Sequence, residues 1–405
     1  MILMKDMKEV LQKIMPKEPK KVMGEVKEFM QKIEKQLKMN KLDAKCILGG
    51  SFAKDTWLEG DYDVDLFIAF DKKYRGQPIS NMLEKALAPW KPIRVHGSRD
   101  YFWIKNDITF ELIPVLAIKK PTEAENLTDS SPLHVNWVNK NKKYKNEIRL
   151  TKKFLKAQKC YGAESFIKGF SGHVTDILVI HYKGFPNFLK NAAKWTPKTI
   201  IDPYNKHKGK ALFVLNRSKT EGPLVLIDPI DPLRNAAAAL SQEKYDLFVK
   251  SAKEYLKKQN ISFFEEKQPN FDELKKKGKL VIVDVEPLEG KPDVTFTKIL
   301  HAYEYMTKKL EPFDIITYDW QWKNQPKLWW VLKIEKLPET EKQEGPPTTI
   351  KEGVENFKKK HAKTIIQDGR VYAIEKVLLR TPEEVVKSVI EEKYVKDKAK
   401  SFRIL

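Results

Sequence analysis

The chain has 405 residues, of which 41% are hydrophobic and 11% aromatic, so it can build folded cores and is not wholly disordered. Its formal net charge of +21 favours a polyanionic partner, with nucleic acid ahead of a membrane surface. The alternative interpretation of this charge is a lysine- and glutamate-rich surface of the thermophile type.

Cysteine content and apolar segments indicate the compartment. Cys46 and Cys160 form no CxxC pair, and no histidine or cysteine spacing is typical of zinc, so we predict no disulfide framework and no zinc site. No apolar run approaches the roughly 18 residues of a membrane span, and the first residues lack the apolar core of a signal peptide. We therefore expect a cytoplasmic protein with no membrane partner.

Residues 1–132 are predicted to form a small α/β unit. A helix is expected over 18–38, where apolar residues recur at helical spacing. Strands are expected over 44–48 and 63–70, and residues 101–118 should form a β-hairpin.

Residues 133–265 are predicted to form a mostly helical domain. The segment 145–162 repeats apolar residues on one side of a helix, with lysines on the other. The segment 171–182 is nearly all apolar, so its helix should be buried, and residues 226–260 should form a turn followed by a long helix.

Residues 266–405 are predicted to combine strands and helices, which makes the whole chain α+β. The predicted order is strand, helix, strand, strand, which is typical of a ferredoxin-like sheet. These elements are expected over 275–287, 296–310, 314–322 and 328–337. A loop over 337–347 and a hairpin over 366–379 should follow. At least two of the four tryptophans in this region, Trp320, Trp322, Trp329 and Trp330, are expected in a core.

The stretch GGSFAKDTWLEGDYDVDLFIAF, residues 49–70, carries the clearest chemical signal. Asp63 and Asp65 share one strand face because side chains alternate along a strand, and like charges held there repel each other. Paired carboxylates are natural ligands for Mg²⁺. The preceding Gly49-Gly50-Ser51 turn lets backbone N–H groups approach an anion. Together these features predict phosphoryl or nucleotidyl transfer.

A third carboxylate is expected from the hairpin, where Glu111 stands among apolar residues before Pro114. The alternative is a pair of solvated aspartates at a strand edge, with Glu111 paired to a lysine. Asp61 is expected to close the turn at Gly60 rather than to bind a metal.

The Gly-Ser turn, the Asp-x-Asp strand and the hairpin carboxylate resemble the core of polymerase-beta-type nucleotidyltransferases. Three further segments resemble the archaeal, class I CCA-adding tRNA nucleotidyltransferases. These are RLTKKFLKAQKCYGAE (149–164), GFSGHVTDILVIHYKGF (169–185) and IDPIDPLRNAAAALS (227–241). The tail segment DGRVYAIEKVLLRTPEE (368–384) resembles them too. The resemblance implies a catalytic head, a helical domain that selects the nucleotide, and a C-terminal body and tail that bind tRNA.

The resemblance also implies roles for single residues. Asp63, Asp65 and Glu111 would hold Mg²⁺. Nucleotide contacts would come from Gly50, Ser51, Lys54, Ser131, His134, Lys152, Tyr161, Arg234 and Asn235. Arg234 matches the arginine that helps to select C and A, and its alternative role is a salt bridge with Asp228 or Asp231. For the lysines the alternative is a solvated helix face, and for Tyr161 it is packing. His173 and His181 lie in a buried-looking helix, where a structural role is favoured over metal ligation.

Two departures from the family pattern stand out. Glu111 falls where the family usually has Asp, and residues 96–102 lack a Glu-His-Pro-Tyr-like run, which leaves Arg99 as a candidate phosphate or base contact. The implied activity is addition of CCA to the 3′ end of tRNA from CTP and ATP, with a homodimer through the tail as a candidate assembly. The alternatives are an enzyme that forms poly(A) or oligoadenylate, or a non-catalytic tRNA-binding paralogue.

Overall fold

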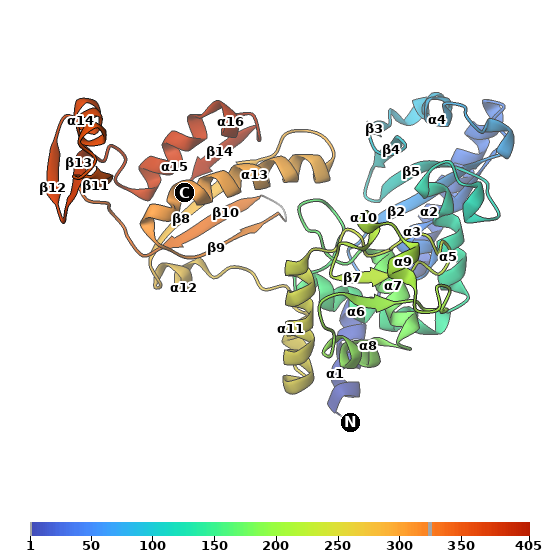
Figure 1. The fold of residues 1–405 in the computed structure, drawn as a ribbon. Coiled ribbons are helices and arrows are strands. Elements are labelled where there is room, and N and C mark those ends of the chain that lie inside the picture. The colour runs from blue at the N-terminus through green and yellow to red at the C-terminus, as the bar shows by residue number, and fades with distance from the viewer. Residues whose placement is uncertain (1, 323–325) are drawn as a thin grey trace. The chain divides into compact units, whose positions relative to one another are not determined.

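The computed structural model describes residues 2–322 and 326–405, and the chain divides into two compact units, Met1–Lys267 and Gln268–Leu405 (Figure 1). The first unit contains a five-stranded sheet in the order β1-β2-β5-β4-β3. Strands β2 and β5 run parallel and the other neighbours antiparallel, so the sheet is mixed. The elements of this head are α2 (Pro19–Met39), β1 (Ala44–Leu48), α3 (Gly50–Ala53), β2 (Asp63–Phe70), α4 (Ile79–Leu87), β3 (Ile93–Val95), β4 (Tyr101–Lys105) and β5 (Thr109–Leu116).

The two faces of this sheet are covered by different helices. One face packs under α2 and α4, and α2 forms there because its apolar residues recur every three or four positions. Val64 and Leu66 of β2 point into this core and are fully buried. The opposite face carries Phe67 and Ala69, which Val135 of α5 (Ser131–Asn139) covers. The same face continues to the two aspartates at the start of β2, beyond this small apolar cluster.

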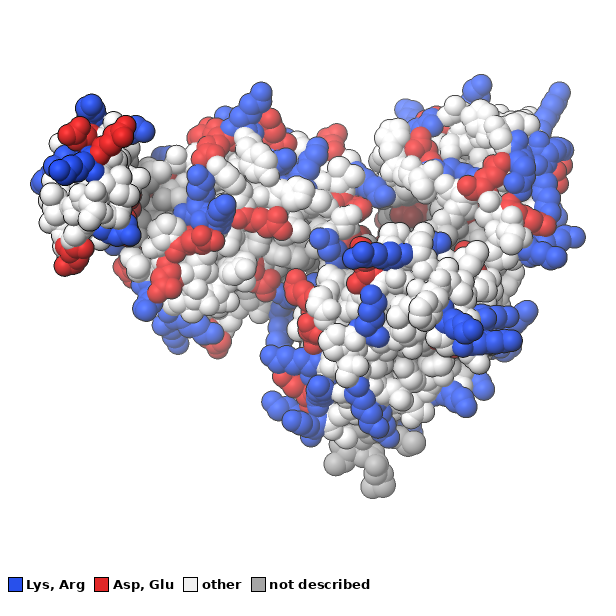
Figure 2. Space-filling view, viewed as in Figure 1, with Lys and Arg blue, Asp and Glu red and all other residues white. Residues whose placement is uncertain are grey.

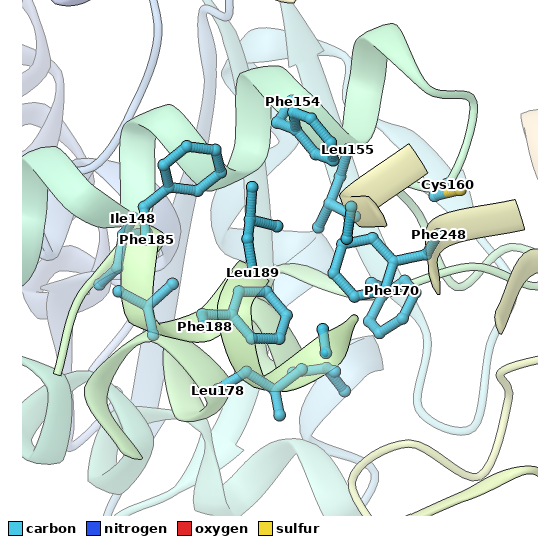
Figure 3. Close-up of a cluster of buried hydrophobic side chains, with 14 of the residues drawn as sticks. Ile148, Phe154, Leu155, Cys160, Phe170, Leu178, Phe185, Phe188, Leu189 and Phe248 are labelled. Atoms are coloured by element: carbon cyan, nitrogen blue, oxygen red, sulfur yellow. The ribbon is translucent and has the colours of Figure 1, made fainter. Parts of the chain in front are cut away.

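A second core fills the helical part of the first unit, and many of its contacts are aromatic (Figure 3). Phe154 lies edge-on to Phe185, with ring centroids 5.7 Å apart. The helix α1 (Ile2–Ile14), which the sequence placed with the head, packs in this core through Met7, Val10 and Ile14. The other elements are α6 (Lys145–Ala157), α7 (Gly172–His181), α8 (Phe185–Ala192), β6 (Thr199–Ile201), α9 (Ala211–Val214), α10 (Arg217–Thr220), β7 (Leu224–Leu226) and α11 (Gln242–Lys258).

The second unit is built on an antiparallel sheet in the order β14-β8-β10-β9, with helices packed on its core. Strands and helices follow each other as β-α-β-β-α-β, which confirms the ferredoxin-like prediction. Trp329 and Trp330 are buried, as expected for at least two of the tryptophans. The elements are α12 (Phe271–Lys275), β8 (Lys279–Glu286), α13 (Pro292–Leu310), β9 (Ile315–Gln321), β10 (Lys327–Leu332), α15 (Pro382–Glu391), α16 (Lys393–Lys396) and β14 (Ser401–Ile404).

The tail of this unit corrects one prediction. Residues 340–347 form the strand β11 (Thr340–Pro347) rather than a loop, paired with β13 (Arg370–Lys376). Its sequence lacks apolar alternation because it is an edge strand with exposed side chains, held through its backbone. The predicted hairpin is present as β12 (Thr364–Gln367) and β13, and α14 (Lys351–Lys360) lies between β11 and β12 in the chain.

Lysine and arginine side chains are spread over the visible surface of both units, with acidic side chains interspersed (Figure 2). The excess of basic residues is therefore not confined to one unit. Within residues 2–322 and 326–405, no helix is both long and apolar enough to cross a membrane.

Candidate active site

The paired aspartates and Glu111 meet on the open face of the head sheet. Val64 and Leu66 are buried on the other face, so Asp63 and Asp65 face away from that core. Asp63 is exposed and Asp65 is half-buried. The parallel pairing of β2 and β5 sets Asp65 directly beside Glu111. Carboxylates from segments more than forty residues apart in the chain therefore share one face, on adjacent strands.

The glycine turn lies directly against this pair of strands. The N–H of Gly49 donates to the carbonyl oxygen of Asp65 over 2.8 Å. Gly50 has φ +54, and a Cβ atom built there would lie 1.6 Å from Oδ2 of Asp65. Only glycine can bring the backbone this close to the carboxylate while keeping that conformation. The turn and the predicted metal ligands are thus one packed arrangement.

The electrostatics of the aspartates fit a site that a cation completes. Burial raises the pKa of Asp65, and Lys54 opposes this only in part. Burial and the neighbouring Asp61 raise the pKa of Asp63. Two of the nearby lysines are engaged by other carboxylates, since Lys54 pairs with Asp176 and Lys156 with Asp61. Two carboxylates left facing each other in this way are suited to a divalent cation.

Glu111 is held towards the neighbouring strand. Its Oε1 accepts a hydrogen bond of 2.7 Å from Nε1 of Trp103, its cross-strand partner. Within the described part of the chain, the set of three possible ligands whose atoms all lie within 4.8 Å of one another is His134, His173 and Asp228. The oxygens of Asp63, Asp65 and Glu111 are more widely spaced, so the longer Glu111 side chain is not drawn into one tight cluster with the aspartates.

The Trp103 contact leads to a testable expectation. Replacing Trp103 by phenylalanine removes a hydrogen bond to a carboxylate, which is worth roughly 1.5–3 kcal/mol, and keeps the ring. We expect kcat for nucleotide transfer to fall about tenfold, since 1.4 kcal/mol corresponds to a factor of ten. Thermal melting should change little, because Trp103 is only half-buried. Unchanged kcat would show that the indole does not orient Glu111.

A cluster of charged and polar groups from α3, α6 and α7 adjoins the carboxylates. The Nζ of Lys54 lies 2.6 Å from Oδ2 of the fully buried Asp176. Lys152 is also buried, and its Nζ donates to the carbonyl oxygen of Thr56 over 3.1 Å. Neither lysine lies on a solvated helix face. Burial raises the pKa of the Tyr161 hydroxyl above its usual range, and Asp176 adds to this effect.

Asp176 was not predicted from the sequence, although a signal was there. It is the one acidic residue in the nearly apolar segment 171–182, and an acid in a buried helix needs a compensating partner. Lys54 supplies that partner. The half-buried Lys54, the buried Lys152 and the Tyr161 phenol thus lie near one buried anion beside the glycine turn, a set that suits a polyanionic ligand.

Three protein-family models match the chain: a nucleotidyltransferase domain over residues 30–199, the second domain of tRNA nucleotidyltransferases over 146–265, and the C-terminal domain of CCA-adding enzymes over 286–402. The CCA-adding enzyme of Nanoarchaeum equitans is 38% identical over 340 residues, covering 81% of this chain and 82% of its own. That of Thermococcus gammatolerans is 30% identical, covering 96% and 89%. This chain belongs to the CCA-adding enzyme family. It is therefore a nucleotidyltransferase, and enzymes of this kind use divalent metal ions.

Solved structures confirm the fold class of this family member. A cytoplasmic RNA terminal U-transferase matches with a TM-score of 0.52 at 14% identity, covering 66% of this chain and 99% of its own. A poly(U) polymerase matches with a TM-score of 0.51, also at 14% identity, covering 65% and 98%. At these identities the likeness shows the fold alone, a nucleotidyltransferase head with accompanying helices.

The remaining candidate residues of this CCA-adding family member lie around the loop that follows β7. Arg234 forms the salt bridge with Asp228 that was its alternative role, over 2.9 Å. His134, on the helix that Ser131 begins, also reaches Asp228. The Asn235 side chain is occupied by backbone groups, accepting from Leu226 and Ala237 and donating to Lys219 and Leu224. Direct contact of these residues with a nucleotide stays a prediction.

Arg99 is paired with an acidic residue inside the head. Its guanidinium pairs with the fully buried Asp129, which also accepts from the backbone N–H of Leu116 over 2.9 Å. Burial would raise the pKa of Asp129, but the hydrogen bonds from Arg99 and Leu116 lower it overall. Arg99 thus anchors the segment before α5 to the sheet, and its contact with a phosphate or a base stays a prediction.

Proposed function

We propose that this chain adds CCA to the 3′ end of tRNA, taking CTP and ATP as substrates and using no nucleic-acid template. The observation that carries the proposal is the alignment of Asp65 with Glu111 across β2 and β5, directly under the Gly49-Gly50-Ser51 turn. This is the arrangement that nucleotidyl transfer needs, a set of acids beside an anion-binding turn. We infer the substrates, tRNA with CTP and ATP, from the membership of the chain in the CCA-adding enzyme family.

The chemistry assigns a task to each group. The 3′-hydroxyl oxygen of the tRNA attacks the α-phosphorus, a new phosphodiester bond forms, and the bond to the β-phosphate bridging oxygen breaks to release pyrophosphate. We propose Asp63, Asp65 and Glu111 as ligands for Mg²⁺, which would polarise the phosphate oxygens and lower the pKa of the attacking hydroxyl. The proposed triphosphate contacts are Gly50, Ser51, Lys54, Lys152 and Tyr161.

Base selection needs other groups. Arg234 presents fixed donors, and cytosine and adenine both offer ring-nitrogen acceptors. We propose that Arg234 reads the base, that Ser131 and His134 lie near the nucleotide, and that Asn235 acts by holding the loop that carries Arg234.

A tRNA extension assay tests the function. With Mg²⁺, a tRNA that ends before its CCA should gain two C residues from CTP alone and the complete CCA from CTP and ATP, and EDTA should stop the reaction. Long A tracts on generic RNA with ATP alone would favour an enzyme that forms poly(A). Binding of tRNA without any incorporation would identify a non-catalytic paralogue and refute the proposal.

The pH dependence of nucleotide use provides a further check. Burial lowers the pKa of Lys152 to about 8, and the neighbouring Asp176 opposes this in part. Lys54, Lys156 and Asp61 are its other charged neighbours. Lys152 is cationic below this pKa and neutral above it, so its attraction for a triphosphate should disappear as the pH rises. We expect kcat/KM for CTP to fall above about pH 8, by up to tenfold per pH unit.

The control is Lys152→Arg, because arginine keeps its charge throughout this range. The falling limb should move to higher pH in this variant. The same limb in both proteins would assign the titration to a different group.

We also propose that residues 266–405 hold the tRNA body through phosphate contacts and shape, and that the protein acts in the cytoplasm as a homodimer formed through the tail. The free, buried Cys46 and Cys160 suit a reducing compartment. A binding constant for tRNA that decreases steeply with salt supports the phosphate contacts, and sedimentation of the full chain tests the dimer.

A further inference from the structure

One oxygen atom in the first unit lies close to three side-chain nitrogen atoms, and two of them, on His173 and Arg234, form hydrogen bonds with it. Oδ2 of Asp228 lies 3.1 Å from Nε2 of His134, 3.2 Å from Nε2 of His173 and 2.9 Å from Nη1 of Arg234. Asp228 is fully buried. The three nitrogens come from α5, from α7 and from the loop of Asp228 itself, so this carboxylate joins three segments that are far apart in the sequence.

The other oxygen of Asp228 shapes the loop itself. Oδ1 accepts from the N–H of Ile230 over 2.8 Å and from the N–H of Asp231 over 3.3 Å. The N–H of Asp228 in turn donates to the carbonyl oxygen of Arg234 over 3.1 Å. The carboxylate therefore fixes both the backbone turn before Arg234 and the direction of the Arg234 side chain.

The surroundings of Asp228 and His173 determine the charges of these two residues. Burial would raise the pKa of Asp228, but its close contacts with His134 and His173 lower it far below its usual range. Burial lowers the pKa of His173 to about 4, so this imidazole is neutral at physiological pH. A neutral His173 can donate to Asp228 only from Nε2, which makes Nδ1 the unprotonated nitrogen. The rings of His134 and His173 lie against each other, with centroids 4.1 Å apart.

The same histidines and Asp228 are close enough together to resemble a metal site. The guanidinium of Arg234, however, already places a positive charge on the same oxygen that a metal would need. A divalent ion there would have to displace that cation. The donor set therefore fits an anchor for Arg234 better than a ligand set for a metal.

The guanidinium of Arg234 is held by only one arm. Within residues 2–322 and 326–405 its Nη1 donates to Asp228, while Nη2 and Nε donate to no protein group, and 26% of the side chain is exposed. An arginine fork that is clamped on one side presents its remaining donors in a fixed direction. The guanidinium can distinguish base edges only while its hydrogen bond to Asp228 is kept.

We propose that Asp228 is a positioning residue for nucleotide selection, which orients Arg234 and His134 so that C and A are accepted and U and G rejected. This inference rests on the proposed function. It assigns no contact with the nucleotide to Asp228 itself, which is fully buried. A base that requires Arg234 to turn would have to break a buried, charge-assisted hydrogen bond.

The test is Asp228→Asn in the full chain, because asparagine keeps the turn-forming oxygen and replaces only the oxygen that His134, His173 and Arg234 approach. Its matched control is Asp231→Asn in the same loop, where Oδ1 accepts from the N–H of Leu233. We expect the ratio of kcat/KM for CTP to that for UTP to fall at least tenfold in Asp228→Asn. It should stay within about twofold of the wild type in the control.

A merely structural role would lower the melting temperature without changing this ratio. Combining Asp228→Asn with Arg234→Ala should lower the ratio no further than Arg234→Ala alone, since both changes remove the same oriented group. If Asp228→Asn does not fold, Arg234→Lys replaces it: its ammonium can still reach Asp228 but has no second arm, so the ratio should fall while the KM for triphosphate changes little. An unchanged ratio in either folded variant refutes the inference.

The proposed function has its own separate outcome. If the wild-type protein adds no nucleotide to tRNA, that proposal fails, and calorimetric titration of the full chain with CTP and with UTP then tests Asp228 directly. Preference for CTP in the wild type that disappears in Asp228→Asn would still support the positioning role. Equal affinity of the wild type for both nucleotides would refute it.

Discussion

Asp65→Asn is expected to lower nucleotide addition by more than about 100-fold, because even residues that only support a metal ligand cost 10- to 100-fold when removed. Asparagine has nearly the same shape but lacks the negative charge, so the change weakens the proposed cation site and leaves the packing against Gly50 in place. Burial raises the pKa of Asp65, so the ionised carboxylate is costly in this position. Removing that charge should leave the melting temperature unchanged or higher.

The measurement is single-turnover extension of a tRNA that lacks CCA, together with thermal melting. The matched control is Asp61→Asn, four residues away, whose carboxylate pairs with Lys156. That variant should retain activity within about threefold, because surface ion pairs contribute only about 0–1 kcal/mol. Full activity in Asp65→Asn would overturn the site, whereas equal losses in both variants would indicate a general effect of charge.

Gly50→Ala is expected to have the second largest effect. Gly50 has φ +54, and a Cβ atom there would meet Oδ2 of Asp65 at 1.6 Å, so either the turn or the carboxylate must move. The left-handed backbone alone costs about 1–2 kcal/mol for a residue with a side chain. Because the displaced group is a proposed metal ligand, activity should fall by at least about tenfold beyond the loss of stability.

Gly60→Ala separates the two causes. Gly60 also has a positive φ, +82, but nothing lies within 4 Å of a Cβ atom built there. This variant should show the conformational cost in urea unfolding while keeping its activity. Similar activity losses in both variants would mean that backbone strain, and not the clash with Asp65, is responsible.

Local sequence patterns were sufficient for much of the fold. Alternation along residues 63–70 put Asp63 and Asp65 on one face. Helical spacing predicted α2 close to its observed bounds and the start of α6, and a nearly continuous apolar segment predicted α7. Periodicity failed at β11, because an exposed edge strand is held by backbone hydrogen bonds and needs no apolar alternation. It also missed that α1 packs with the helical core, since a buried stripe does not reveal which core it faces.

Some features of the candidate site could also be predicted from the sequence, whereas others depend on tertiary packing. The residue types and spacing in 49–70, with the segments further along the chain, were enough to identify the family and the paired aspartates. The pairing of β2 with β5 aligned Asp65 with Glu111, and the folding of distant helices brought Asp176 to Lys54 and Asp228 to Arg234. These contacts join residues roughly 50 to 120 positions apart, or lie in a loop whose shape depends on them. A local pattern records which face of an element is apolar, but the partner of a buried charge is decided only when tertiary packing removes water from it.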